Sequence, residues 1–225
     1  DFESLEGSAS VYAATGTQVS IASGRLAFAL GTQGPCASID TACSSALVAL
    51  DAATLSLRAC DTALAAAANV LLQPIVSLLF ARAGMLSADG RCKTFDARAN
   101  GYVRSEGVCA VALGVGDASY TLAGLAVRAD GKSASLTAPN GSAQARLIGA
   151  ALAAAARHAL PLIEAHGTGT PLGDPTEVGA LEHTLGSVGA SLGAVKANVG
   201  HMEPVAGLAG LLALCLLYTS DAADD

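Results

Sequence analysis

The sequence predicts an α/β fold, in which short apolar strands alternate with helices. Strand-length apolar runs are repeatedly followed by apolar residues at helical spacing, and glycine-rich loops separate them. Hydrophobic residues make up 52% of the 225 positions and aromatic residues only 4%, a composition that suits close packing of helices on sheets. The chain is long enough for one large domain or two small ones with a substantial buried core.

Helices are predicted where apolar residues recur three or four positions apart. The expected helices cover residues 23–31, a segment beginning at Ser44, and residues 142–160, 176–186 and 206–217. Ser142 is the expected N-cap of the third helix, since its hydroxyl can accept a backbone hydrogen bond there. The last segment, AGLAGLLALCLL, is shorter than the about 18–20 residues that cross a membrane, so it predicts a buried core helix.

Strands are predicted where short apolar runs lie between turn residues. The expected strands cover residues 34–40, 61–72, 108–116 and 122–130, and two more begin at Leu162 and Ala194. The run over 61–72 is also compatible with a helix joined to a strand. Because these runs lack polar alternation, we expect strands buried on both faces. The polar, turn-rich residues 87–107 predict a long loop.

Composition argues against several classes of protein. A net charge of −7 with twelve basic residues argues against a nucleic-acid partner, because phosphate binding needs clustered lysine and arginine. The first residues, DFESLEGSAS, lack the basic and apolar regions of a signal peptide. They also lack an initiating methionine, so we expect the chain to begin inside a longer protein. No run is long enough to span a membrane.

The six cysteines, at positions 36, 43, 60, 92, 109 and 215, have no metal-ligand spacing, so no metal is expected. Three disulfides are one possibility. In a chain without an export signal, free thiols in the cytoplasm or another reducing intracellular compartment are the expected state.

Cys43 differs from the others in its setting, DTACSSALVAL, between a predicted strand and a predicted helix. Unpaired N–H groups and the positive end of the helix dipole stabilise a thiolate at such a position. We therefore expect a nucleophile with a lowered pKa. A buried structural cysteine is the alternative interpretation.

Two of the four histidines lie in glycine-rich loops after predicted strands. His166 lies in EAHGTGTPLGDP, beside the hydroxyls of Thr168 and Thr170, and His201 lies in KANVGHMEP. The other two, His158 and His183, lie in helical patterns and are expected to have no catalytic role.

A thiolate with two imidazoles fits acyl transfer through a covalent thioester. One histidine suffices as a base for hydrolysis. The second indicates a further task, the donation of hydrogen bonds to a carbonyl oxygen that gains negative charge.

Three blocks, DTACSSALVAL, EAHGTGTPLGDPTEVGAL and KANVGHMEPVAGLAGLL, resemble in order and character the β-ketoacyl synthase family, specifically ketosynthase domains of type I polyketide synthases. Weaker matches extend the resemblance over most of residues 11–214. It implies a thiolase-like, layered αβαβα fold with two similar halves, truncated at both ends. Residues 1–116 would belong to the first half and 117–217 to the second. Residues 218–225 would be a polar tail, either frayed or not native.

The resemblance also implies roles for seven side chains. The acyl-accepting nucleophile and the two catalytic histidines correspond to Cys43, His166 and His201. A supporting charged pair corresponds to Lys196 and Glu203, and hydroxyls that contact a phosphopantetheine arm correspond to Thr168 and Thr170.

The implied reaction is a decarboxylative Claisen condensation, in which a malonyl-type extender on acyl carrier protein attacks an acyl chain held on the cysteine. It implies an acyltransferase-type enzyme without metal or redox cofactor, since the substrates are carried on phosphopantetheine. The implied partners are acyl carrier protein, malonyl-type and acyl thioesters, and a second copy in a homodimer.

Three alternatives remain open from the sequence: the ketosynthase of a type I fatty acid synthase, a non-elongating carrier-binding domain, and a cysteine hydrolase. Five of the twelve basic residues lie between Arg82 and Arg104. They are expected either to meet an acidic carrier protein or to form ion pairs within their own loop.

Overall fold

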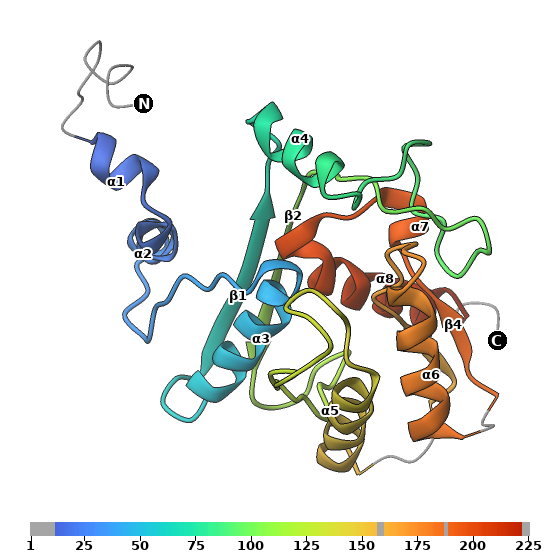
Figure 1. Cartoon of the computed structure of the whole chain (residues 1–225). Coiled ribbons are helices and arrows are strands. Elements are labelled where there is room, and N and C mark those ends of the chain that lie inside the picture. Colours follow the sequence, from blue (N-terminus) through green and yellow to red (C-terminus); the bar gives the residue numbers. More distant parts are fainter. Residues whose placement is uncertain (1–11, 157–159, 187–188, 222–225) are drawn as a thin grey trace.

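The computed structural model describes residues 12–156, 160–186 and 189–221 and confirms the α/β fold (Figure 1). The described strands form two small sheets. β1 (Thr62–Asn69) pairs antiparallel with β2 (Gly107–Gly114). β3 (Leu162–Glu164) pairs parallel with β4 (Ser191–Gly193).

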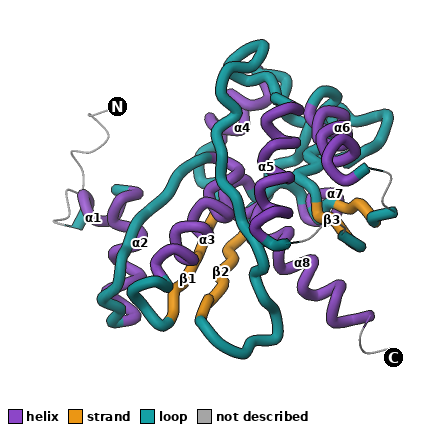
Figure 2. The backbone as a smooth tube through the Cα atoms, turned by 90° about the horizontal axis from the view of Figure 1, so that it is seen from below, coloured by secondary structure: helices purple, strands orange, loops and turns teal. Residues whose placement is uncertain are grey.

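Two helices pack on the sheets, and one of them contacts strands of both. α3 (Ser45–Ser56) packs on β1, and α8 (Ala206–Asp221) contacts α3, β2 and β3. α5 (Gly141–Ala154) and α6 (Gly173–Leu185) lie side by side in both ribbon views (Figures 1 and 2). The shorter elements are α1 (Ala13–Thr17), α2 (Val19–Leu30), α4 (Pro74–Arg82), α7 (Lys196–Val199) and the 3₁₀ turns η2 (Ala42–Ser44) and η3 (Glu203–Val205).

The core lies between α3 and the β1–β2 sheet. Leu50 and Ala53 of α3 pack against Ala65 of β1, and Leu211 of α8 packs against this cluster. Leu208, near the start of α8, is fully buried. This packing fixes the first turn of α3, and therefore η2 just before it, against the sheet.

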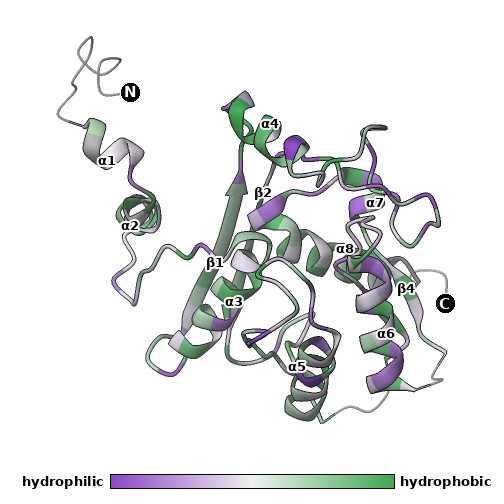
Figure 3. Ribbon diagram, in the orientation of Figure 1, coloured by the Kyte–Doolittle hydropathy of each residue, from purple (hydrophilic) through white to green (hydrophobic). Residues whose placement is uncertain are grey.

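The strands β1 and β2 are not buried on both faces, contrary to expectation. Their residues alternate between more covered and exposed positions, and Val108 on the outer face is 74% exposed. α3 covers one face, whereas no described element covers the other, so both faces carry apolar residues but only one is packed (Figure 3).

The helices α1 and α2 extend away from the rest of the molecule (Figure 1). None of the residues of α2 is buried, and Phe28 is 91% exposed. Within the described ranges, no helix combines the length and the hydropathy needed to cross a bilayer.

The helix predictions are confirmed in type, with shifted ends. α2 ends at Gly31, which takes the left-handed conformation at φ 68°, and α6 ends at Gly186. The prediction of Ser142 as N-cap is wrong: Asn140 holds that position, and its side-chain oxygen accepts the Ala143 N–H at 3.1 Å. The end of this predicted helix, residues 157–159 with His158, lies outside the described residues.

α8 continues to Asp221, so it includes residues 218–221 of the expected tail, while 222–225 lie outside the described residues. The expected core helix is confirmed only at its start. Leu208 is buried, whereas Leu216 near the other end of the helix is 70% exposed.

The strand predictions succeed where a partner strand is present. The predictions over 61–72 and 108–116 are confirmed by β1 and β2, and that at Leu162 by β3. The predicted strand at Ala194 lies slightly earlier, as β4. Residues 34–40 and 122–130 form no strand, because an apolar segment needs a hydrogen-bonded neighbour and none of the described segments pairs with them. The long loop over 87–107 is confirmed up to the start of β2.

Candidate active site

Cys43 lies in the tight turn η2, directly before α3, as its sequence setting predicts. The Asp40 carboxylate accepts the Ala42 N–H at 3.0 Å, and Ala42 takes a positive φ of 55°. The Ser45 hydroxyl accepts the Thr41 N–H at 2.9 Å. These local hydrogen bonds turn the chain sharply and present the Cys43 side chain at the end of the helix.

His201 is held in place by its own backbone. Its N–H donates to the Val103 carbonyl at 2.8 Å, and its carbonyl accepts the Ser105 N–H at 3.0 Å. Gly200 before it has φ 79°, and a Cβ there would lie 3.0 Å from the Ser105 side chain, so this close approach requires glycine. The ring is 1% exposed, and its Nε2 lies 3.1 Å from Cys43 Sγ.

The second ring nitrogen of His201 fixes the tautomer. Nδ1 accepts the Glu203 backbone N–H at 3.2 Å, so in the neutral ring the proton resides on Nε2. Nε2 therefore donates toward Cys43 Sγ and toward any substrate oxygen placed beside it.

His166 lies in the loop after β3, and its ring lies beside Cys43 and His201. Glu177 on α6 accepts the N–H groups of His166 and Gly167 at 2.6 and 2.8 Å, one on each carboxylate oxygen. Gly167 has φ 43°, and a Cβ there would lie 2.6 Å from the Thr94 side chain. The His166 and His201 ring centroids are 5.5 Å apart at 85°.

The three predicted reactive groups thus converge. The sulfur of Cys43 and one nitrogen from each of His166 and His201 all lie within 4.8 Å of one another. A single carbonyl group placed there would meet a thiol and two imidazoles together.

Thr168 and Thr170 lie in the loop after His166, with their hydroxyls 3.3 Å apart. Asp174 organises this loop: its carboxylate accepts the N–H groups of Gly169 and Thr170 at 3.1 and 3.3 Å, and that of Phe95 at 2.9 Å. The loop is therefore tied to the 92–96 segment, and the threonine backbone lies at a fixed place beside the site.

Lys196 and Glu203 do not form the expected pair with each other. Lys196 is 4% exposed at the start of α7, and the carboxylates of Glu164 and Glu177 oppose the effect of burial on its pKa, which is nevertheless lowered. The Glu203 carboxylate instead binds Arg104, at 2.5 and 2.9 Å.

Desolvation keeps both imidazoles neutral, although His166 is exposed at the surface whereas His201 is buried. Desolvation, with smaller contributions from His166 and the Lys196 charge, lowers the pKa of His201 to about 3. The surrounding loops lower the pKa of His166 to about 4 by desolvation, again assisted by Lys196. At neutral pH both rings therefore remain hydrogen-bond donors without positive charge.

The expected direction of the Cys43 pKa is wrong. Burial raises the pKa of the thiol and the Glu203 charge raises it further, while Lys196 and the backbone N–H of Cys43 lower it to a smaller extent. The helix end is present, but desolvation outweighs it.

A thiol and two imidazoles also form a donor set suited to a soft metal. Coordination through Nε2 of His201 would move its proton to Nδ1, where it would meet the Glu203 N–H. Two donors would then face each other, so this arrangement suits hydrogen-bond donation better than metal binding.

Sequence reasoning missed several residues that organise the site. Tyr102 packs edge-on against His201, at 5.0 Å between centroids, and burial raises the pKa of its phenol to about 12. Asp174 and Glu177 stand three residues apart at the start of α6. An acidic residue in a first helical turn, here Asp174, is a readable signal, but nothing local indicates which loops these two carboxylates hold.

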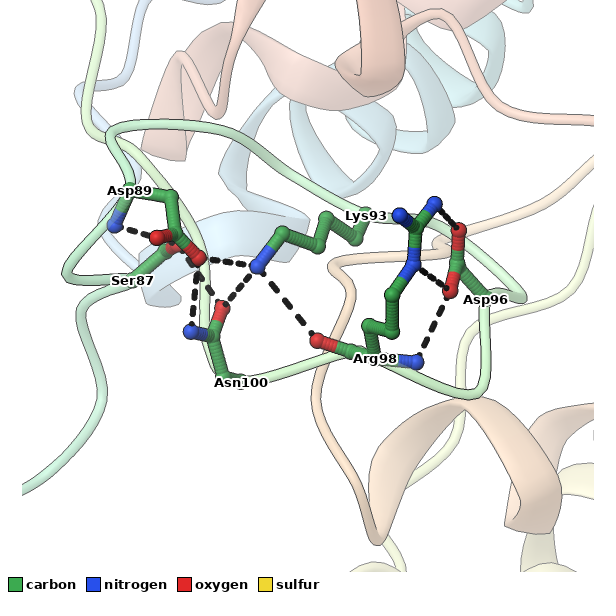
Figure 4. A network of polar contacts seen from close by, with 6 residues as sticks. All are labelled: Ser87, Asp89, Lys93, Asp96, Arg98 and Asn100. Carbon is green, nitrogen blue, oxygen red and sulfur yellow. Dashed lines mark hydrogen bonds and ion pairs between the residues drawn. The ribbon is translucent and has the colours of Figure 1, made fainter.

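The basic segment forms mostly internal contacts (Figure 4). Lys93 pairs with Asp89, and the Arg98 guanidinium binds Asp96 at 2.7 and 3.0 Å. Together with the Arg104 pair, three of the five basic residues between 82 and 104 have partners within the chain, which favours the internal alternative for them.

Comparisons with known proteins agree with this geometry. The model of the β-ketoacyl synthase N-terminal domain matches residues 2–116, and that of the C-terminal domain matches residues 120–222. A phenolphthiocerol/phthiocerol polyketide synthase of Mycobacterium tuberculosis is 48% identical over 217 residues, which cover 89% of this chain and 10% of that protein. The spectinabilin polyketide synthase protein NorA' of Streptomyces orinoci is 44% identical, over 93% of this chain and 6% of its own length.

Two solved structures share the fold. An oxazolomycin ketosynthase domain from Streptomyces albus has a TM-score of 0.87 at 34% identity, covering 94% of this chain and 40% of that one. The module 6 ketosynthase of the bacillaene synthase from Bacillus subtilis has a TM-score of 0.85 at 35% identity, covering 90% and 40%. The fold is therefore that of the thiolase-like ketosynthases, and the chain belongs to the β-ketoacyl synthase family.

Proposed function

We propose that this chain catalyses a decarboxylative Claisen condensation in polyketide biosynthesis, with Cys43, His166 and His201 as catalytic residues. The observation that carries the proposal is the 3.1 Å approach of His201 Nε2 to Cys43 Sγ, with the His166 ring beside it. A single nucleophile flanked by two neutral N–H donors fits a reaction in which a carbonyl oxygen gains charge.

In the first step, the Cys43 thiolate attacks the acyl thioester of a carrier protein. The carrier thiolate leaves and takes up a proton, and a new thioester forms at Cys43. The Cys43 backbone N–H would donate to the acyl carbonyl oxygen as it gains charge.

In the second step, a malonyl-type thioester on carrier protein occupies the space between the two imidazoles. The bond to its carboxylate breaks, carbon dioxide leaves, and the electron pair forms an enolate. Its oxygen accepts hydrogen bonds from His166 and from Nε2 of His201. The enolate carbon then attacks the Cys43 thioester, the carbon–sulfur bond breaks, and the Cys43 thiolate returns.

The remaining side chains support this cycle. Lys196 supplies a buried positive charge that favours the thiolate and disfavours protonated imidazoles. Thr168 and Thr170 would contact the phosphopantetheine arm of the substrate. We further propose acyl carrier protein as partner, a homodimeric assembly, and residues 1–116 and 117–217 as the two halves of the fold.

The test separates loading from condensation. Mass spectrometry of the protein incubated with an acyl-pantetheine thioester is expected to show an acyl adduct on Cys43, and Cys43→Ala to remove it. Persistent loading of that variant would refute the assigned nucleophile. Loading in the absence of a β-ketoacyl product with malonyl carrier protein would indicate a non-elongating domain, and free acid alone a hydrolase.

The histidines are tested in the same assay. Substituting His166→Gln or His201→Gln removes one donor from the enolate site, and loss of one such donor costs about 10²–10³ in kcat. His183→Gln, on the exposed face of α6, serves as the matched control and is expected to retain wild-type turnover.

A further inference from the structure

We propose that Arg104 is a positioning residue, which holds Glu203 so that the Glu203 backbone N–H fixes the tautomer of His201. The inference deepens the proposed function and rests on it, because the tautomer decides whether Nε2 donates toward Cys43. Arg104 contacts none of the reacting atoms and acts through its neighbour.

The ion pair is bidentate and shielded from solvent. Arg104 Nε and Nη2 bind the two oxygens of Glu203 at 2.5 and 2.9 Å, and the two side chains are 8% and 16% exposed. A fork-to-fork pair of this kind fixes orientation as well as distance. The carboxylate of Glu203 can therefore occupy only a narrow range of positions.

Arg104 is itself anchored on α4. Its Nη1 donates to the Ser77 hydroxyl at 2.7 Å, and its guanidinium carbon lies 5.2 Å from the centre of the Phe80 ring. These two contacts, with the Glu203 pair, hold the guanidinium from different sides. Lysine in its place would retain the charge but could not make the fork.

The backbone of Glu203 needs such a restraint. Its φ is 46°, a left-handed conformation that is unfavourable for a residue with a side chain. Residues persist there only where their surroundings hold them. In this conformation the Glu203 N–H points at Nδ1 of His201, so the grip on the side chain also maintains the hydrogen bond that selects the tautomer.

Residues 103–105 hold both the His201 backbone and, through Arg104, the side chain of Glu203. Arg104 and His201 form an isolated parallel bridge, in which Val103 and Ser105 hold the His201 backbone. The same three-residue segment thus positions the ring directly and, through Arg104, the N–H that faces its far nitrogen. The Arg104–Glu203 ion pair is therefore linked to both sides of the His201 ring: to its backbone through residues 103–105, and to Nδ1 through the Glu203 N–H.

The tautomer can be measured without the condensation reaction. Proton–nitrogen correlation spectra of protein with ¹⁵N-labelled histidine distinguish a ring proton on Nε2 from one on Nδ1, and His201→Gln assigns the signals. The second readout is the rate at which iodoacetamide modifies Cys43, followed by peptide mass spectrometry. Arg98→Ala is the matched control, because it removes an arginine–carboxylate pair from an exposed loop.

Wild type and Arg98→Ala are expected to show His201 protonated on Nε2. In Arg104→Ala, loss of the restrained Glu203 hydrogen bond shifts the tautomer ratio toward Nδ1–H by about two- to tenfold. Cys43 modification slows, since the thiolate loses a donor and faces an uncompensated Glu203 charge. Arg104→Lys is expected to fall between wild type and Arg104→Ala.

A tautomer ratio in Arg104→Ala equal to that of the control overturns the proposal. Should Arg104→Ala fail to fold, Arg104→Lys decides in the same way, and a wild-type ratio there overturns it. If His201 responds as expected while the wild-type protein forms no condensation product, the positioning role stands and the proposed function fails.

Discussion

Replacement of Asp174 by asparagine tests how the loop beside the active site is held. The carboxylate is 4% exposed and accepts three backbone N–H groups, from Gly169, Thr170 and Phe95, between 2.9 and 3.3 Å. Asparagine has one acceptor oxygen, so its NH₂ group must face at least one of these donors. In the best orientation it retains the two bonds to the 169–170 loop and loses the one to Phe95.

The magnitude follows from these three bonds. A buried N–H left unpaired costs about 1–3 kcal/mol, and each remaining bond loses about 1 kcal/mol when its acceptor is no longer charged. The lower cost of burying a neutral amide offsets part of this. We expect the free energy of unfolding to fall by about 3 kcal/mol, and the KM for pantetheine thioesters to rise as Thr168 and Thr170 lose their fixed position.

Urea denaturation followed by circular dichroism measures the first effect. Glu182→Gln on the same helix is the control: its side chain is exposed, and substitutions of this kind stay within about 0.5 kcal/mol. An Asp174→Asn variant as stable as this control would refute the view that the carboxylate holds the two loops together.

Three further predictions follow from the site. Glu177→Gln leaves one side-chain acceptor for the two N–H groups of His166 and Gly167, so the His166 ring loses its fixed position. In steady-state assays kcat is therefore expected to fall by a larger factor than KM rises, and equal factors would contradict this. Because burial raises the pKa of Cys43, its iodoacetamide modification should have a midpoint above the ordinary cysteine value of 9.0, and a midpoint near neutrality would contradict the structure. The pKa of His201 is about 3 in the folded chain and about 6.5 in the unfolded chain, so between these pH values the unfolded chain binds one more proton than the folded chain. The free energy of unfolding should therefore decrease by up to about 1.4 kcal/mol for each pH unit as the pH falls below about 6.5. His201→Gln should flatten that acid limb, and an unchanged slope would show that the ring is not buried neutral.

Helices and reactive residues were predictable because their signals are local. Apolar spacing located α3 and α6, and glycine-rich loops indicated His166 and His201. The strand predictions over 34–40 and 122–130 are wrong, and they show the limit of reasoning from local sequence alone. An apolar run becomes a strand only when a neighbour supplies hydrogen bonds, and that neighbour is chosen by the whole fold.

The errors within the site have the same origin. The helix end that predicts a lowered Cys43 pKa is a local feature, whereas the desolvation that outweighs it comes from segments far along the chain. The partner of Glu203 is Arg104, 99 residues earlier, rather than the nearby Lys196. No spacing rule could pair these two residues, because the bridge between Arg104 and His201, from two segments far apart in the sequence, brings them together.

The hydrogen bond at Nδ1 also decides what His201 cannot do. Nε2 could take a proton from Cys43 only if it carried none of its own. The existing ring proton would then have to lie on Nδ1, facing the Glu203 N–H, and the product would be an imidazolium in a site where burial has lowered the pKa of the ring to about 3. His201 is therefore unsuited to be the base that activates Cys43. It suits the opposite task, since a neutral ring with a fixed Nε2–H can donate first to the thiolate and then to the enolate without changing its charge. The proton of Cys43 must then leave by another acceptor, and the buried Lys196 charge compensates the thiolate that remains.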